Sequence, residues 1–315
     1  MPALHPLDAL LTECRKVIVG QPQLLQRLLV AVLCRGHVLL EGLPGLAKTR
    51  SIKTLASATR MAFRRIQFTP DLLPSDVVGT LVFDPKSLAF TPKKGPIFAN
   101  LVLADEINRA PSKVQAALLE AMEERQVTLG DDSFRLPDPF LVLATQNPLE
   151  QEGTFPLPEA QMDRFLFKLR VDYPNAQEEA EVLRRADGHE EPVQAVMDDR
   201  QLLAAGAGAA RVRLDDALRT YIVHLVQATR VGHGPAWKGK ELLRCGASPR
   251  AGLALQSASK ALAFLAGRDH VLPEDVVALV PDVMRHRLLL TYEAEADGVH
   301  TDQVIQALLG SVARP

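Results

Sequence analysis

The chain has 315 residues, 47% of them apolar and 23% charged, and a formal net charge of −2. This composition is typical of an ordinary globular protein, and the length suits two domains. The small net charge excludes a global electrostatic field that would gather nucleic acid, so we expect no nucleic-acid partner.

The cysteines and the apolar runs indicate the cellular compartment of the protein. Cys14, Cys34 and Cys245 are far apart and odd in number, which argues against a disulfide framework and a cysteine zinc site and fits a reducing compartment. No basic leader precedes an apolar run at the start, and runs such as residues 28–34 are too short to cross a bilayer. We therefore expect a cytoplasmic protein with no membrane span.

Residues 37–50, HVLLEGLPGLAKTR, predict a strand, a glycine-bearing loop and a helix. The phosphate-loop pattern G-x-x-x-x-G-K-[ST] begins here at Gly42 and ends at Lys48 and Thr49, with Ala47 in place of the last glycine. Backbone N–H groups would bind phosphate at the helix N-terminus, Lys48 would contact the outer phosphates, and the Thr49 hydroxyl would bind Mg²⁺. The nucleotide-binding residues would be Gly42, Leu43, Pro44, Gly45, Leu46, Ala47, Lys48 and Thr49.

Ala47 raises the question of whether this loop works. Gly45 can supply the backbone freedom, and Ala47 would lie at the helix entry, where a negative φ costs alanine little. We therefore predict a negative φ at Ala47. A glycine-containing turn with a surface lysine remains the alternative reading of the loop alone.

The strands that follow predict an α/β fold. Apolar runs at 37–41, 63–68, 100–105, 140–146 and 165–171 lack strict alternation, as expected of parallel strands covered on both faces. Residues 110–126 have apolar residues at helical spacing. Two further segments, 79–96 and 126–137, have the turn signals of β-hairpins inserted into this core.

Polar side chains follow two of the predicted strands. Asp105 and Glu106 come at the end of the run 100–105, and the carboxyl ends of parallel strands are the usual place for an active site. Asp105 would bind Mg²⁺ and Glu106 would take a proton from the attacking water. Asn147, beyond the run 140–146, could orient that water. Taken alone, the acids could be a solvated strand end and Asn147 a turn-former before Pro148.

After residue 177 the strand signals fade, and the chain becomes helical in period and rich in alanine and leucine. A second, all-helical domain is the economical interpretation. We therefore predict a nucleotide-binding α/β core over residues 1–173 and a helical lid over residues 174–315.

Several long motifs in order identify a family resemblance. GLPGLAKT, LADEINRAPSKVQAALLEAMEE, ATQNPLEQEGTFPLPEAQMDRF and GASPRA resemble the MoxR family of AAA+ ATPases, and FTPDLLPSDVVG resembles the segment before that family's helix-2 insert. The resemblance implies a three-layer αβα core with a parallel sheet and β-hairpin inserts, followed by an all-α lid. Alanine is common at the position of Ala47 in this family.

The resemblance also implies roles for residues outside the loop. Val19, Gly20 and Gln21 would lie near adenine, Arg164 would be an arginine finger acting on the neighbouring subunit's nucleotide, and Arg250 would be the sensor 2 residue of the lid. The two hairpins would be the helix-2 insert and the pre-sensor-1 insert. Any isolated arginine is more often a surface ion-pair partner.

The implied activity is hydrolysis of ATP with Mg²⁺ in a homo-oligomeric ring, a hexamer, coupled to remodelling, maturing or loading a cofactor into a client protein. The usual partner in the family carries a von Willebrand factor A domain. Two alternatives stay open: a DNA-acting motor with the same inserts, and a non-catalytic nucleotide-binding scaffold. The acidic tip of the second hairpin disfavours the DNA motor, whereas Lys93 and Lys94 leave the first hairpin ambiguous. Arg109 could face a subunit boundary.

Overall fold

The computed structural model describes residues 6–42, 48–147, 153–186, 191–230, 232, 236–237 and 240–315. The chain forms two compact units. The first comprises Met1–Leu157 and Leu169–Ala204, and the second Pro158–Lys168 and Ala205–Pro315. The boundary between a core domain and a lid domain that the sequence suggested at residues 173 and 174 stays a prediction.

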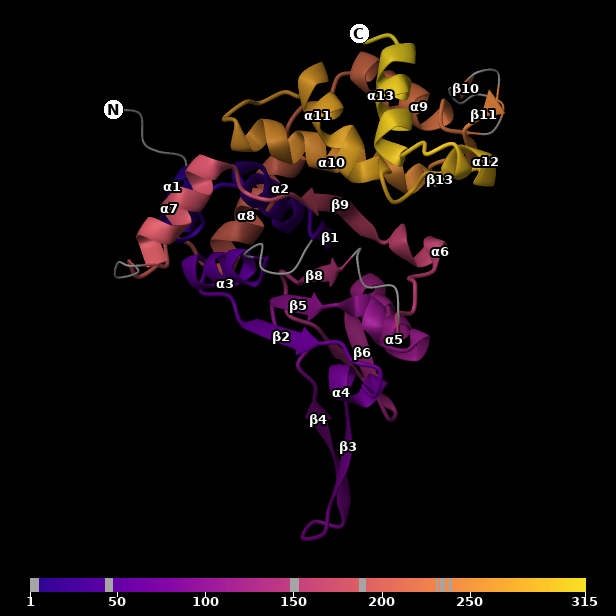
Figure 1. Cartoon of the computed structure of the whole chain (residues 1–315). Helices are drawn as coiled ribbons and strands as arrows, with labels where there is room; N and C mark the ends of the chain where they lie inside the picture. Colours follow the sequence, from indigo (N-terminus) through magenta and orange to yellow (C-terminus); the bar gives the residue numbers. More distant parts are fainter. Residues whose placement is uncertain are drawn as a thin grey trace. The chain divides into compact units, whose positions relative to one another are not determined.

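A five-stranded sheet has the order β2-β5-β8-β1-β9 (Figure 1). Its strands are β1 (His37–Gly42), β2 (Phe63–Gln67), β5 (Leu101–Asp105), β8 (Leu141–Gln146) and β9 (Phe165–Val171). The pairs β2–β5, β5–β8 and β8–β1 are parallel, and the central strands are almost wholly buried, which confirms the prediction from their continuous apolar runs.

The helices of the first unit cover this sheet. In chain order they are α1 (Pro6–Val17), α2 (Pro22–Leu33), α3 (Lys48–Ala58), α4 (Pro74–Val78), the 3-10 turn η1 (Ile107–Arg109), α5 (Ser112–Glu124) and α7 (Ala176–Ala186), with α8 (Asp199–Ala210) continuing into the second unit. α2 packs on β1, α3 packs on β5, and α1 packs on both α2 and α3. α1 is thus in direct contact with the helix that begins at Lys48.

Both predicted hairpins are present and extend from the sheet (Figure 1). They are β3 (Gly79–Asp84) with β4 (Ala89–Lys94), and β6 (Gln126–Leu129) with β7 (Asp132–Arg135). The hairpins touch: a Cβ on Gly130 would lie 2.6 Å from Leu81 Cδ1, and Lys94 Nζ lies 5.3 Å from the Phe134 ring centroid. Lys93 and Lys94 pair with Thr80 and Gly79, so they lie at the base of the first hairpin and not at its tip.

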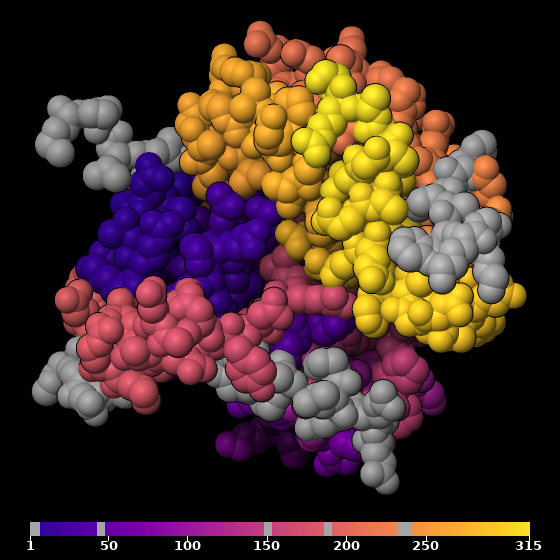
Figure 2. Space-filling model, turned by 45° about the horizontal axis from the view of Figure 1, so that its top comes forward, coloured from indigo at the N-terminus to yellow at the C-terminus, as the bar shows by residue number. Residues whose placement is uncertain are grey.

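The second unit is mainly helical. It contains α6 (Glu159–Met162), α9 (Asp216–Gln227), α10 (Pro249–Leu265), α11 (Pro273–Met284), α12 (Tyr292–Ala296) and α13 (Thr301–Ser311). α10 packs between α9 and α11, and α13 packs on α11, where its yellow surface adjoins the orange helices in Figure 2.

Short strands within this unit were not predicted from the sequence. They are β10 (Ala236–Trp237) with β11 (Lys240–Glu241), and β12 (Leu243–Cys245) with β13 (Leu289–Leu290). Two or three residues are too few for side-chain alternation to reveal a strand. Throughout the described part of the chain, no helix is both long and apolar enough to cross a bilayer.

Candidate nucleotide-binding site

Lys48 marks where the predicted phosphate loop meets its helix. β1 ends at Gly42 and α3 begins at Lys48, whereas Leu43, Pro44, Gly45, Leu46 and Ala47 lie outside the described residues, so the φ of Ala47 stays a prediction. The ammonium group of Lys48 donates to the Gly42 carbonyl. Burial lowers the pKa of Lys48, and the negative charges of Asp105 and Glu106 oppose that decrease. The lysine and both acids therefore lie within electrostatic reach of one another.

Asp105 ends β5 and is held from two neighbouring strands. Its Oδ2 accepts hydrogen bonds from Arg65 Nη2 at 2.6 Å and Nε at 3.0 Å, and its Oδ1 accepts one from the Thr145 hydroxyl at 2.6 Å. Arg65 comes from β2 and Thr145 from β8, the strands on either side of β5. The orientation of the carboxylate is thus fixed on both oxygens.

Glu106 has a left-handed backbone, with φ 57° and ψ 50°. This conformation is uncommon for a residue other than glycine and is often found at functional sites. The Glu106 N–H donates to the Thr145 hydroxyl at 2.9 Å. Its Oε2 accepts from Gln67 Nε2 at 2.8 Å and faces Arg109 Nε at 3.2 Å. Thr145 therefore fixes the backbone of Glu106, while Gln67 and Arg109 fix its carboxylate.

Sequence reasoning missed Arg65, Gln67 and Thr145. A signal was present for Gln67 and Thr145, because each is a polar residue near the carboxyl end of a strand. The missing information was the register, which places Gln67 directly beside Asp105 and Arg65 beside Leu103. Arg109, whose role was left open, contacts Glu106 of its own chain.

Asn147 follows directly after β8 and is half-buried. β8 is the neighbour of both β1 and β5, and all three run parallel. Their carboxyl ends therefore share one edge of the sheet, where Asn147, the two acids and Gly42, the last residue of β1, all lie. This is the arrangement that the sequence predicted for these strand ends.

Val19, Gly20 and Gln21 form the connection between α1 and α2. Gly20 and Gln21 have φ values of 69° and 52°, and a Cβ on Gly20 would lie 2.7 Å from the Glu178 Cδ atom. The positive φ favours glycine at position 20, whereas the flexible Glu178 side chain could move away from a larger residue. Gln21 Oε1 is buried and has no hydrogen-bond partner among the described residues.

The donor groups at the site fit a magnesium nucleotide. Hydroxyl and carboxylate oxygens are the ligands that Mg²⁺ prefers, and Thr49 and Asp105 provide one of each. No group of three or more His, Cys, Asp and Glu side chains in the described ranges could hold a metal ion by itself.

Arg164 and Arg250 belong to the second unit, whereas Lys48, Asp105, Glu106 and Asn147 belong to the first. Arg164 lies between α6 and β9, and Arg250 lies in the first turn of α10. The structure brings the segments bearing these two arginines together: the Ser248 hydroxyl, at the start of α10, donates to Asp163 Oδ2 at 2.8 Å. The roles of both arginines toward a nucleotide stay predictions.

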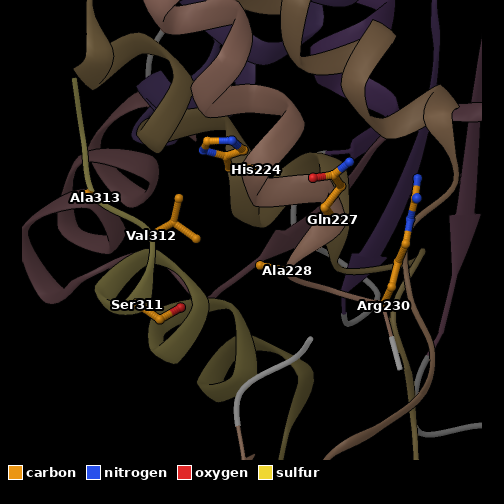
Figure 3. A pocket seen from close by; sticks show the side chains of 7 residues that line it. All are labelled: His224, Gln227, Ala228, Arg230, Ser311, Val312 and Ala313. Carbon is orange, nitrogen blue, oxygen red and sulfur yellow. The ribbon is translucent and has the colours of Figure 1, made fainter. Parts of the chain in front are cut away.

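A separate hollow of about 540 Å³ lies between the end of α9 and the C-terminal residues (Figure 3). Its walls include the side chains of His224, Gln227, Arg230 and Ser311. None of the residues predicted to bind nucleotide lines it, so we assign it no part in nucleotide chemistry.

Comparisons with known proteins agree with this geometry. Residues 37–167 match the "ATPase family associated with various cellular activities (AAA)", and residues 239–308 match the AAA lid domain. Chaperone MoxR1 of Mycobacterium tuberculosis is 47% identical over 99% of this chain and 83% of its own. Protein MoxR of Paracoccus denitrificans is 33% identical over 95% of this chain and 93% of its own.

A solved structure shows the same fold at full length. The crystal structure of a candidate ATPase from Cytophaga hutchinsonii superposes with a TM-score of 0.91 at 46% identity, covering 98% of this chain and 94% of its own. The motifs, the strand-end site, the lid and these near full-length relatives agree, and the chain belongs to the MoxR family of AAA+ ATPases.

Proposed function

We propose that this protein hydrolyses ATP with Mg²⁺ in a homo-oligomeric ring, a hexamer, and couples hydrolysis to remodelling, maturing or loading a cofactor into a client protein. The observation that carries the proposal is that Asp105 and Glu106 lie at the carboxyl edge of the sheet, where the parallel strands β1 and β8 also end and beyond which Lys48 begins α3. A solvated strand end would need neither the left-handed backbone of Glu106 nor its fixed partners.

Each residue has a chemical task in this proposal. Lys48 binds the outer phosphates, and Thr49 and Asp105 hold Mg²⁺, which neutralises phosphate charge when bound. Glu106 accepts a proton from the attacking water, and Asn147 orients that water. Gln67 and Arg109 hold the Glu106 carboxylate in one orientation, because both contact its Oε2.

Residues outside this edge complete the proposed site. The buried, unpartnered Oε1 of Gln21 supports the assignment of Val19–Gln21 to the adenine, whose amino group is a suitable donor. Arg164 would stabilise the transferring phosphoryl group of the neighbouring subunit, and Arg250 would act on the nucleotide of its own subunit.

A protein client is supported by the printed name of one relative, a chaperone. A partner with a von Willebrand factor A domain rests on the family resemblance, as does a cytoplasmic location. The base position of Lys93 and Lys94 leaves Lys86 as the one basic residue of the first hairpin's turn, and the second tip carries Asp131 and Asp132, which together disfavour the DNA-motor alternative. Stimulation of ATP turnover by DNA at low salt would instead support that alternative.

Glu106→Gln tests the catalytic part of the proposal. Loss of the proton acceptor should lower ATP turnover by about 10²- to 10⁴-fold while a fluorescent ATP analogue still binds. Glu120→Gln, the same chemical change at an exposed position of α5, is the matched control and should keep wild-type turnover. Absence of turnover in the wild-type protein, with ATP bound, would indicate a scaffold instead.

A further inference from the structure

Arg287, just after α11, is a buried arginine whose hydrogen-bonding capacity is fully used. Its side chain is 3% exposed. Nε donates to Asp163 Oδ1 at 2.7 Å, Nη2 to the Asp163 and Phe165 carbonyls, and Nη1 to the Leu166 and Val283 carbonyls. A guanidinium has five N–H groups, and here all five have acceptors. Four of the five acceptors lie in the segment 163–166, which includes Arg164.

The two preceding residues bind the same segment. Arg285 Nη1 donates to the Lys168 carbonyl at 2.6 Å, and His286 Nε2 donates to the Phe165 carbonyl at 2.9 Å. Burial holds the pKa of His286 well below its usual range, so the ring is neutral and Nε2 carries its one proton. Three consecutive residues thus attach the chain around Arg164 to the end of α11.

Asp163 extends this attachment to the helix that bears Arg250. Its Oδ1 is bound by Arg287, and its Oδ2 accepts from the Ser248 hydroxyl at 2.8 Å. The same hydroxyl caps α10 by accepting from the Arg250 N–H at 3.1 Å. A second ion pair, Arg244 Nη2 to Glu159 Oε1 at 2.7 Å, also joins the segment around Arg164 to the chain before α10.

We propose that Asp163, Ser248 and Arg287, here called the Asp163 cluster, are positioning residues that hold the backbone at Arg164 in a fixed place relative to the first turn of α10, so that a shift of one of the two arginines, Arg164 or Arg250, is transmitted to the other. Resting on the proposed function, this means that a change at Arg250 caused by one subunit's nucleotide is transmitted to Arg164, the arginine that this subunit offers to its neighbour.

Energetics favour a cluster that stays intact during such a movement. A buried guanidinium deprived of its carboxylate partner is strongly destabilising, so the pair of Arg287 and Asp163 stays together when either arginine shifts. For the same reason, an Arg287 variant tests folding as much as positioning. Ser248 is the better site for substitution, since its hydroxyl is the direct link between Asp163 and α10.

Two substitutions at Ser248 distinguish its role as the N-cap of α10 from its hydrogen bond to Asp163. Ser248→Asp keeps a strong helix cap but places a carboxylate against Asp163, whereas Ser248→Thr keeps the donating hydroxyl. Ser257→Asp adds the same charge at an exposed position of α10 and is the matched control. Ser248→Gly, which removes the hydroxyl at little cost to the cap, is a second test that does not depend on the folding of the aspartate variant.

The experiment places these changes in a subunit that cannot hydrolyse ATP itself. Donor subunits carry Glu106→Gln together with a Ser248 or Ser257 change, and recipient subunits carry Arg164→Ala. In mixed oligomers, turnover arises only where a recipient's nucleotide meets a donor's Arg164. We expect donors with Ser248→Thr or Ser257→Asp to restore ATP turnover. Donors with Ser248→Asp or Ser248→Gly should restore about ten- to a hundredfold less turnover, because displacing the catalytic arginine, Arg164, by about 1 Å lowers the rate on that scale.

The outcomes distinguish this inference from the function on which it rests. Equal restoration by the Ser248→Gly and Ser248→Thr donors would refute the coupling. No restoration by donors with wild-type Ser248, although mixed oligomers form, would instead refute the action of Arg164 on a neighbour. A purely structural role would lower the donor's melting temperature without this loss in the neighbour, so thermal unfolding of each donor is measured alongside.

Discussion

At the scale of single residues, the site depends on Thr145, whose hydroxyl donates to Asp105 Oδ1 at 2.6 Å and accepts from the Glu106 N–H at 2.9 Å. One buried hydroxyl therefore orients both the proposed metal ligand and the proposed general base. It also supports the left-handed backbone of Glu106, a conformation that persists only where neighbours hold it.

Thr145→Val should damage both stability and turnover. Valine has the shape of threonine but leaves the Glu106 N–H and Asp105 Oδ1 without this partner, which costs about 1–3 kcal/mol of unfolding free energy. We expect ATP turnover to fall roughly ten- to a hundredfold as Glu106 shifts. Denaturant unfolding and steady-state turnover are the measurements. Thr145→Ser, which keeps the hydroxyl, is the control, and wild-type turnover in the valine variant would contradict this role.

At the scale of elements, apolar patterning predicted the strands well. The run 165–171 coincides with β9, as expected of a largely buried strand with a continuous apolar run. Residues 63–68 contain β2, an edge strand in which only Ile66 is buried. Asp105, Glu106 and Asn147 could be predicted because the end of an apolar run, followed by polar residues, is visible in a single sequence. Their partners were not, since Arg65, Gln67 and Thr145 depend on which strands are neighbours and in what register. The Asp163 cluster was missed for the same reason, because Arg287 binds a carboxylate 124 positions earlier in the chain.

His37 ties three elements of the core together. On β1, its Nδ1 accepts from the Val142 N–H of β8 at 3.0 Å, and its Nε2 donates to the Met122 carbonyl of α5 at 3.2 Å. A ring that accepts at one nitrogen and donates at the other is neutral. Burial lowers the pKa of His37 to about 4, with a smaller contribution in the same direction from the charge of Arg125. Protonation would break the bond to β8.

The pH dependence of stability follows from this shift. Between pH 6.5 and about 4 the unfolded chain binds a proton at this histidine and the native protein does not, so stability falls as the pH falls through that window. The loss at this site is on the order of 3 kcal/mol. In His37→Asn, whose side-chain carbonyl can replace Nδ1 as acceptor, unfolding free energy should decline less between pH 7 and pH 4.5. Equal declines in both proteins, measured by urea unfolding, would show that His37 is not the group responsible.

At the scale of the whole molecule, nucleotide binding should stabilise the unit that contains α1, because α1 packs on α3, the helix that begins at Lys48. Cys14 of α1 reports on this unit: it is 1% exposed, and burial raises the pKa of its thiol to about 12. Its reaction with a maleimide therefore requires opening of the protein. Cys245 is exposed and should react without opening.

In a protein with Cys34→Ser and Cys245→Ser, ATP and Mg²⁺ should slow labelling of Cys14. A ligand at 100 times its dissociation constant stabilises the native state by about 2.7 kcal/mol, which reduces the open population roughly 100-fold when opening and closing are fast. The comparison is labelling half-time with and without nucleotide, followed by mass spectrometry. Lys48→Ala should abolish the protection because the phosphates lose their principal cation. If the Lys48→Ala protein were still protected, the nucleotide would bind elsewhere. If ATP bound to the Cys34→Ser, Cys245→Ser protein without slowing the labelling of Cys14, α1 would open independently of the site.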